Sequence, residues 1–230
     1  MIAPPVIEER DGYFVARDDL LPGGTKMRLM LPYLAERHEM EFVYASPAYG
    51  YAQVALAHCT RMLNKKATIF TAKRKKPHEL TLRAKAAGAR IFMVPHGYLS
   101  NVQSKANKYC QDTGAKQLPF GANIPQAINF LVEDIKRVNF TPDIVWTVAG
   151  SGTLTRALQK VWPEAEFHAV IVGTESADIG RAKKYKAPEK FEQAARRPPP
   201  FPSSAWYDAK AWQFFKPVPD KKVLFWNVGA

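Results

Sequence analysis

Short segments rich in β-branched and aromatic residues alternate along the chain with segments of helical pattern, and no other feature constrains the fold as strongly. The pattern predicts strands at 13–16, 41–45, 67–70, 90–94, 144–148, 167–172 and 223–226. It predicts helices at 27–38, 51–63, 77–87, 99–113, 124–138 and 153–161. Such alternation favours parallel sheet with helices on both faces. The nearly continuous apolar runs at 144–148 and 169–172 predict strands that are buried on both faces.

Size and composition set further bounds. With 230 residues, 47% of them hydrophobic, the chain can form one large domain or two closely packed lobes. No run of about 18 apolar residues occurs, so no membrane partner is expected. The first ten residues lack the features of a secretory signal, and Cys59 and Cys110 are the two cysteines, which favours a reducing cytoplasm. Neither a CxxC nor an HExxH spacing occurs, so no metal site is predicted.

The positive charge is segregated along the chain. The formal net charge is +12, yet residues 61–116 hold 13 basic and 2 acidic residues and residues 181–222 hold 11 and 4. Residues 1–60 and 117–180 are each net −3. Segregated positive charge suits a polyanionic partner such as nucleic acid. The alternative is a solvated basic surface that keeps the protein soluble, and the charge pattern alone leaves both interpretations open.

Residues 144–158 have the pattern of a buried strand, a turn of small residues and a helix. In such a turn, backbone N–H groups and the start of the helix favour an anion. Glycines allow close approach of the backbone, and hydroxyl groups add hydrogen-bond donors. The candidate phosphate-binding residues are Gly150, Ser151, Gly152, Thr153 and Thr155. The alternative is a tight strand-to-helix turn whose only role is to cap the helix.

A second candidate is Lys26, which follows the turn Gly23-Gly24-Thr25 at the predicted start of a helix. The positive end of the helix favours a neutral amine there, and Schiff-base chemistry requires a neutral amine. A single lysine in this position can also be an ordinary exposed side chain.

Together, these motifs identify a family. The stretch around Lys26 resembles the GGNK lysine motif of the fold type II pyridoxal-phosphate (PLP) enzymes. It is most similar to the branch that holds aminocyclopropane-carboxylate deaminase and D-cysteine desulfhydrase, and the family also includes tryptophan synthase β-like enzymes. The turn at Gly150 resembles their phosphate loop, residues 45–58 resemble their substrate-binding strand, loop and helix, and residues 206–210 and 223–229 resemble their C-terminal segments.

The resemblance covers nearly the whole chain in order, and it implies the family's fold. That fold is α/β, with two open, twisted, mostly parallel sheets and flanking helices, here shortened relative to the family. It implies a larger PLP-binding lobe made of residues 1–40 and 115–230 and a smaller, mobile substrate lobe made of residues 41–114. Family members often form homodimers, so a dimer is one of the oligomeric states left open.

The resemblance also assigns roles around a PLP cofactor. Lys26 would hold the cofactor as a Schiff base and move protons at the substrate's α-carbon. The residues from Gly150 to Thr155 named above would hold the phosphate. The partner of the pyridine nitrogen would be Tyr207, Asp208 or Asn227, and the sequence does not separate the three.

The substrate loop departs from the family pattern. Where the family has Ser, small residues and then Asn, this chain has Ser46-Pro47-Ala48-Tyr49-Gly50-Tyr51. Tyr49 stands where the resemblance expects the Asn that contacts the cofactor, and Pro47 has no N–H to donate to a substrate carboxylate. We expect Ser46, Tyr51 and Gln53 to line the substrate site and Tyr49 to assist proton transfer. A loosely held carboxylate favours decarboxylation.

We therefore expect PLP-dependent decarboxylation of an amino-acid group attached to a modified DNA base. The setting would be similar to certain viral DNA-hypermodification pathways, in the cytoplasm of the host. Two basic segments would contact the DNA: Lys73, Arg74, Lys75 and Lys76, and then Arg181, Lys183 and Lys184. Two alternatives stay open. One is a deaminase or desulfhydrase of free amino acids, and the other is an inactive PLP-enzyme fold that only binds nucleic acid.

Overall fold

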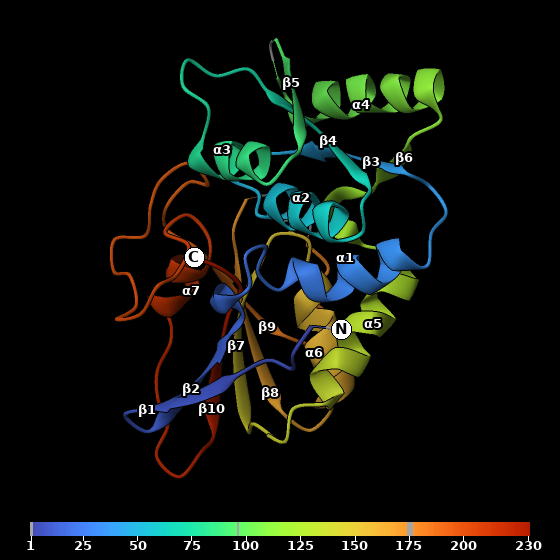
Figure 1. Cartoon of the computed structure of the whole chain (residues 1–230). Coiled ribbons are helices and arrows are strands. Elements are labelled where there is room, and N and C mark those ends of the chain that lie inside the picture. The colour runs from blue at the N-terminus through green and yellow to red at the C-terminus, as the bar shows by residue number, and fades with distance from the viewer. Residues whose placement is uncertain (1, 96, 174–176) are drawn as a thin grey trace. The chain divides into compact units, whose positions relative to one another are not determined.

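The computed structural model describes residues 2–95, 97–173 and 177–230, which form two compact units (Figure 1). Unit 1 comprises residues 1–25 and 128–230, and unit 2 comprises residues 26–127. This division assigns more residues to the second unit than the predicted lobe 41–114. The helix α1 (Lys26–Ala35) packs on α2 (Ala52–Met62), and β6 (Lys116–Leu118) pairs with β3 (Glu41–Ser46), so both belong with the segment between them.

The core of unit 1 is a six-stranded sheet in the order β1-β2-β10-β7-β8-β9. Its strands are β1 (Ile7–Arg10), β2 (Tyr13–Arg17), β10 (Val223–Asn227), β7 (Ile144–Ala149), β8 (Glu166–Ile171) and β9 (Lys183–Lys186). Only the β1–β2 pair is antiparallel. The inner strands β7, β8 and β10 are almost entirely buried, as the apolar runs 144–148 and 169–172 predict for β7 and for the second half of β8.

Two helices pack on opposite faces of this sheet (Figure 1). On one face, α6 (Thr153–Val161) packs on β7 and β8. On the other, the five-residue helix α7 (Asp208–Trp212) contacts β7, β8 and β10. Because α7 is so short, large aromatic side chains from the segments around it cover much of this face. Phe215, for example, packs edge-on against Phe225 of β10, with ring centroids 5.7 Å apart.

Unit 2 is built on a parallel sheet in the order β5-β4-β3-β6, where β4 is Lys66–Ala72 and β5 is Arg90–Val94. Its other helices are α3 (Glu79–Ala86) and α4 (Leu99–Thr113), and α5 (Pro125–Lys136) begins in this unit and continues in unit 1. The helix α4 packs on β3 and β4 over a core that includes Val43, Phe70, Val102 and Ala106. It ends where Gly114 adopts a left-handed conformation, a common helix stop.

The predicted fold class is confirmed, because the chain forms two mostly parallel sheets with flanking helices. Each predicted strand and helix is present, with ends that shift by up to three residues. The sequence analysis missed β1, β6, β9 and α7, all of them five residues or shorter. No helix in the described part of the chain is long and apolar enough to span a membrane.

Candidate active site

The turn between β7 and α6 has the architecture of an anion site. It follows the carboxyl end of a central parallel strand and leads directly into a helix. The N–H of Gly150 donates to the Tyr207 hydroxyl (2.9 Å), and the hydroxyl groups of Ser151 and Thr153 lie 3.0 Å apart. Backbone and hydroxyl donors therefore gather at the start of α6, where the helix dipole favours negative charge.

Glycine at position 152 is required by two separate features. Gly152 has φ 77°, a left-handed conformation, and a Cβ built on it would lie 1.7 Å from the carbonyl oxygen of Asp178. The Arg156 guanidinium donates to the same carbonyl (2.7 Å) and pairs with the Asp178 carboxylate (3.0 Å). The segment around Asp178 thus supports the turn from outside, and any side chain at position 152 would displace it.

The candidate phosphate residue Thr155 lies deeper than the turn. Its side chain is fully buried, and its hydroxyl lies 2.9 Å from the hydroxyl of Thr147 on β7. Thr147 in turn lies 3.3 Å from the carbonyl of His168. Thr155 therefore links α6 to the sheet, and Ser151 and Thr153 are the hydroxyl groups nearest the turn itself.

The three residues proposed for the ring nitrogen all belong to unit 1, and two of them are fully buried. Asp208 Oδ2 accepts from the N–H of Gly229 (3.2 Å), and Asn227 Nδ2 donates to Pro202 O (2.8 Å). Burial raises the pKa of Asp208 well above its usual value, although backbone hydrogen bonds oppose the rise. Among the described residues, neither Asp208 Oδ1 nor Asn227 Oδ1 has a hydrogen-bond partner. Each leaves a buried acceptor that a ligand N–H would satisfy.

The segment that precedes Lys26 is fixed by a buried polar network that the sequence analysis did not foresee. The Thr25 hydroxyl donates to Asp18 Oδ2 (2.6 Å), and Trp226 Nε1 donates to the Thr25 hydroxyl (2.9 Å) and approaches Asp18 Oδ2 (3.2 Å). The N–H of Thr25 also donates to Val228 O (2.9 Å). The residue bonded directly to Lys26 is therefore anchored to the C-terminal strand β10 and the residues after it.

Lys26 is the first residue of α1, and its side chain is partly exposed. Its Nζ donates to the carbonyl of Gly121, and the N–H of Gly121 donates to the hydroxyl of buried Tyr44 (3.1 Å). Burial raises the pKa of Tyr44 to about 12, so its hydroxyl stays neutral. The turn is tight, since Gly121 has φ 70° and Ala122 has φ 51°. Tyr44 therefore holds the carbonyl that receives the lysine.

The altered loop 46–51 is organised by Gln53 from inside. The Gln53 side chain is fully buried, and its Nε2 donates to Ala48 O (3.0 Å) and Gly50 O (3.1 Å) and approaches Pro47 O (3.5 Å). The Ser46 hydroxyl donates to Pro47 O (2.9 Å). Two of the three residues that we expected to bind substrate therefore bond to the loop itself and set its shape.

Both loop tyrosines pack against cationic side chains. The Tyr49 ring lies 4.4 Å from the His78 ring and 4.9 Å from the Arg74 guanidinium. The Tyr51 hydroxyl accepts from Arg83 (2.8 Å), whose guanidinium lies 5.3 Å from the Tyr51 ring. Each tyrosine thus joins the loop to the basic region that runs from the end of β4 into α3.

The predicted basic segments differ in how their side chains are engaged. Lys73, Arg74, Lys75 and Lys76 are exposed in the connection from β4 to α3. In contrast, the Arg181 guanidinium donates to the carbonyls of Trp162, Pro163 and Ala165, which follow the end of α6. Lys183 and Lys184 are exposed on β9, an edge strand, where lysines also discourage edge-to-edge pairing.

The sequence analysis missed Asp18, Thr25 and Trp226, which fix the segment before Lys26 within unit 1. It also missed Tyr44 and Gly121, which hold the Lys26 side chain within unit 2. One local signal was present, because Asp18 and Thr25 are polar residues in a stretch that already drew attention. The other three lie far from Lys26 in sequence, and a single sequence carries no mark of such contacts.

The two mostly parallel sheets and their flanking helices have the fold of the fold type II PLP enzymes. A homologue of ACC deaminase superposes with a TM-score of 0.76 at 15% identity, over 94% of this chain and 84% of that one. Threonine deaminase isoform 2 of Solanum lycopersicum superposes with a TM-score of 0.71 at 13% identity, over 95% of this chain and 74% of that one. Diaminopropionate ammonia lyase of Escherichia coli superposes with a TM-score of 0.67 at 15% identity, over 95% of this chain and 77% of that one.

The likeness rests on structure, since no protein-family model and no curated protein sequence matches the chain. The residues present nevertheless fit a cofactor of the PLP type. The turn at Gly150 offers donors for a phosphate, and Asp208 and Asn227 each offer a buried acceptor without a partner among the described residues. A carboxyl as buried as that of Asp208 is stabilised in its charged form when a positive group approaches it.

Proposed function

We propose that the chain is a PLP-dependent enzyme that acts at the α-carbon of an amino-acid group. The observation that carries this proposal is the turn from Gly150 to Thr153, which collects anion donors at the start of α6 in unit 1. It is supported by the fold shared with proteins whose names describe deaminases and an ammonia lyase. PLP, when bound, withdraws electrons from a bond to the α-carbon.

Each part of the cofactor has proposed partners in the chain. The N–H groups from Gly150 to Thr153 and the hydroxyls of Ser151 and Thr153 would bind the phosphate, and the Gly150 N–H would exchange its bond to the Tyr207 hydroxyl for one to the ligand. Asp208 or Asn227 would accept a hydrogen bond from the ring nitrogen, and Asp208 would also supply a countercharge. Lys26, whose Nζ the Gly121 carbonyl orients, would bind the cofactor's carbonyl carbon and then carry a proton to or from the α-carbon.

For the reaction itself we propose decarboxylation of an amino-acid group that is attached to a modified DNA base. In that reaction the bond from the α-carbon to the carboxylate breaks, CO2 leaves, and a proton from Lys26 or Tyr49 takes its place. Support comes from the loop 46–51, where Gln53 turns three carbonyls inward and Pro47 lacks an N–H, and from the exposed basic segment 73–76. A base in duplex DNA would have to leave the stack to react.

A lyase of free amino acids is the second candidate, and the names of the similar structures favour it: a homologue of ACC deaminase, threonine deaminase and diaminopropionate ammonia lyase. The two candidates differ in their response to salt. Turnover of modified DNA would fall steeply as salt rises. For each phosphate that the protein neutralises, the logarithm of the DNA-binding constant falls by about 0.9 with every tenfold increase in salt. Turnover of a free amino acid would change little.

The first experiment tests the lysine. The full chain is mixed with PLP, reduced with borohydride and digested, and the peptide that contains Lys26 is analysed by mass spectrometry. We expect a cofactor-sized mass increase on that peptide and its loss in Lys26→Ala. Lys105→Ala, which removes an exposed lysine on α4, is the matched control. If wild type carried no modified peptide, or if the modification lay elsewhere, the proposed function would be wrong, and a protein that only binds nucleic acid would become the leading candidate.

A further inference from the structure

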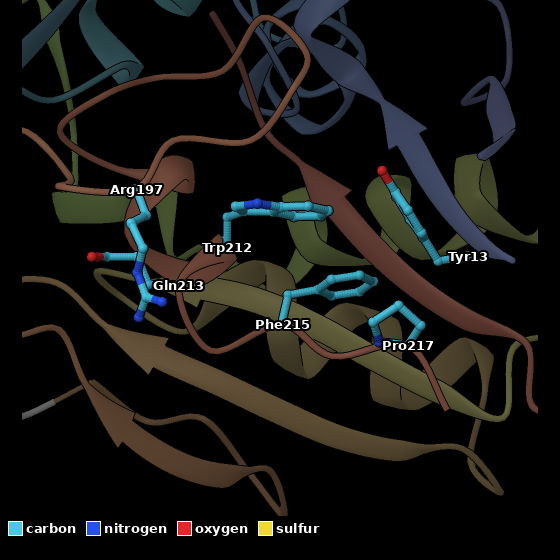
Figure 2. Close-up of a pocket in the computed structure, with 6 residues that line it drawn as sticks. All are labelled: Tyr13, Arg197, Trp212, Gln213, Phe215 and Pro217. Carbon is cyan, nitrogen blue, oxygen red and sulfur yellow. The ribbon is translucent and has the colours of Figure 1, made fainter. Parts of the chain in front are cut away.

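Unit 1 contains a pocket of about 250 Å³ on the sheet face that α7 covers. It is lined by Tyr13, Arg197, Trp212, Gln213, Phe215 and Pro217. Figure 2 shows the Trp212 and Phe215 rings lying parallel, with Arg197 and Gln213 on one side and Tyr13 and Pro217 on the other. The volume suits one ring system with a small substituent, since pockets for drug-sized ligands start at about 300 Å³.

The pocket is separate from the turn at Gly150. Tyr13 is the first residue of β2. The residue after it, Phe14, pairs with Leu224 of β10, and Val223 pairs with Ile144 of β7, so Tyr13 lies at the level where β10 and β7 begin. Gly150 follows the opposite end of β7. Six strand residues separate the two levels, which corresponds to roughly 20 Å along the sheet.

Aromatic rings form its apolar wall. The Trp212 and Phe215 rings are stacked, with centroids 4.6 Å apart and planes 14° apart. Tyr13 packs against both, at 5.4 Å from Trp212 and 5.2 Å from Phe215. Trp212 is partly exposed, whereas Tyr13 and Phe215 are buried behind it. A planar ring that entered the pocket would extend this stack or pack edge-on against it.

The cationic side of the pocket is held in place by a buried carboxylate. Glu189 accepts from the backbone N–H of Arg196 (3.1 Å) through Oε1 and from Gln213 Nε2 (3.0 Å) through Oε2. Fully buried Lys210 donates to the carbonyls of Lys190 (2.7 Å) and Phe191 (3.3 Å). These bonds connect the segment that carries Arg197 to the segment that carries Gln213, so both sides of the pocket have a defined position.

Arg197 brings an uncompensated charge to this site. Its side chain is exposed, and its guanidinium forms no ion pair or hydrogen bond with the part of the chain that the structure describes. None of the residues that line the pocket is acidic. An aromatic wall alone would also accept a cation, but the free guanidinium repels one and attracts an anion.

We propose that this pocket binds a planar aromatic ring that carries an anionic substituent, with the ring against Trp212 and the anion on Arg197. The ligand could be a free aromatic acid or a nucleotide, because both present that chemistry. The site does not depend on Lys26 or on the turn at Gly150, so it stands or falls apart from the proposed enzymatic function.

The test compares charged and neutral forms of the same ring by calorimetric titration of the full chain. The probes are indole-3-acetate with indole-3-acetamide, and thymidine 5′-monophosphate with thymidine. We expect at least one anion to bind about 5-fold more tightly than its neutral counterpart, as a partly exposed charge-assisted contact would give. The pair that shows the difference identifies the source of the ligand.

Variants then connect the effect to the pocket. Arg197→Gln is expected to remove the preference for the anion, whereas Arg196→Gln, which changes the neighbouring arginine outside the pocket lining, is expected to keep it. Trp212→Leu should weaken the binding of both the charged and the neutral form of the probe. Because Arg197 is exposed, its variant does not threaten the fold. The proposal is overturned if neither anion binds, if the neutral probe binds equally well, or if the two arginine variants behave alike.

Discussion

The two units of this chain differ sharply in charge. Unit 2 holds 16 lysines and arginines against 5 acidic residues, a net charge of +11, whereas unit 1 holds 17 against 16, a net charge of +1. Nearly all of the +12 therefore belongs to one of the two units. Along the sequence, by contrast, the positive charge is divided between two separate stretches, residues 61–116 and residues 181–222.

The units also differ in where their polar groups lie. Unit 1 buries a set of ionisable side chains, among them Asp18, Asp208 and Lys210, each of which hydrogen-bonds to other groups of the unit. Unit 2 keeps most of its charge at the surface, as in the exposed run from Lys73 to Lys76. The comparison teaches that most buried, hydrogen-bonded ionisable side chains belong to unit 1, whereas the excess positive charge that acts over long distances belongs to unit 2.

The largest expected effect in unit 1 is that of Gly152→Ala on stability. A Cβ at this position has both an unfavourable φ and a collision with Asp178 O, so we expect the free energy of unfolding to fall by about 4 kcal/mol. Gly12→Ala is the matched control, since Gly12 has φ 80° with no atom within 4 Å of its Cβ, and it should cost about 1.5 kcal/mol. Urea unfolding measures both, and equal losses would show that the contact with Asp178 gives way easily.

The buried network before Lys26 should come next in size. Asp18→Ala removes the acceptor of the buried Thr25 hydroxyl and the second, longer contact of the Trp226 indole, and we expect a loss of about 3 kcal/mol in urea unfolding. Glu9→Ala, an exposed acidic residue on β1, should change stability by less than about 0.5 kcal/mol. We also expect slower borohydride trapping at Lys26 in Asp18→Ala. Unchanged trapping in a folded variant would show that the network does not position the lysine.

Two matched pairs of substitutions test which unit supplies the positive charges that would bind DNA. Lys75→Gln with Lys76→Gln changes unit 2, and Lys183→Gln with Lys184→Gln removes the same charge from unit 1. If DNA binds unit 2, the first pair should reduce the slope of log K against log salt by about 1.8, at 0.9 per lost phosphate contact, and the second by much less. Fluorescence anisotropy of labelled duplex DNA at several salt concentrations gives the slopes. Equal reductions would mean that both basic segments contact the DNA.

The smallest expected effect concerns two histidines. Burial lowers the pKa of His58 in unit 2 and of His168 in unit 1, but Arg61 and Arg83 lower it further at His58, whereas Glu166 opposes the decrease at His168. Added salt screens these charges, so the pKa of His58 should rise, whereas at His168 the screening of Glu166 and of Lys183 acts in opposite directions and should leave the pKa nearly constant. NMR titration of the imidazole protons measures both. A parallel rise at both histidines would remove the contrast between the units.

How much the sequence alone could predict depended on how local each feature is. The helix α4 was predicted at its observed ends, 99–113, because its helical pattern lies within one continuous segment. The strand β9 was missed because its sequence, KKYK, has no apolar alternation, and its pairing with β8 alone makes it a strand. The turn at Gly150 was predicted from its glycines, whereas its support from Asp178 depends on a contact 26 residues away.

The same contrast applies to individual side chains. Arg181 counted as a free positive charge in the sequence, but its guanidinium binds the carbonyls that follow α6. Gln53 was expected to face a substrate, and its amide instead fixes the loop in front of α2. A residue type indicates which bonds a side chain is able to form, and only the tertiary structure decides which partner it meets.

The pairing of β2 with β10 has a consequence for how the chain folds. These strands lie near opposite ends of the sequence, so on the ribosome β2 emerges long before its partner Leu224–Asn227 exists. Unit 2 is one continuous segment and can fold in the meantime, whereas the unit 1 sheet must wait for the last strand to be synthesised. A nascent chain that stops before β10 would leave the β2 edge open, and that stage is where chaperones would be needed most.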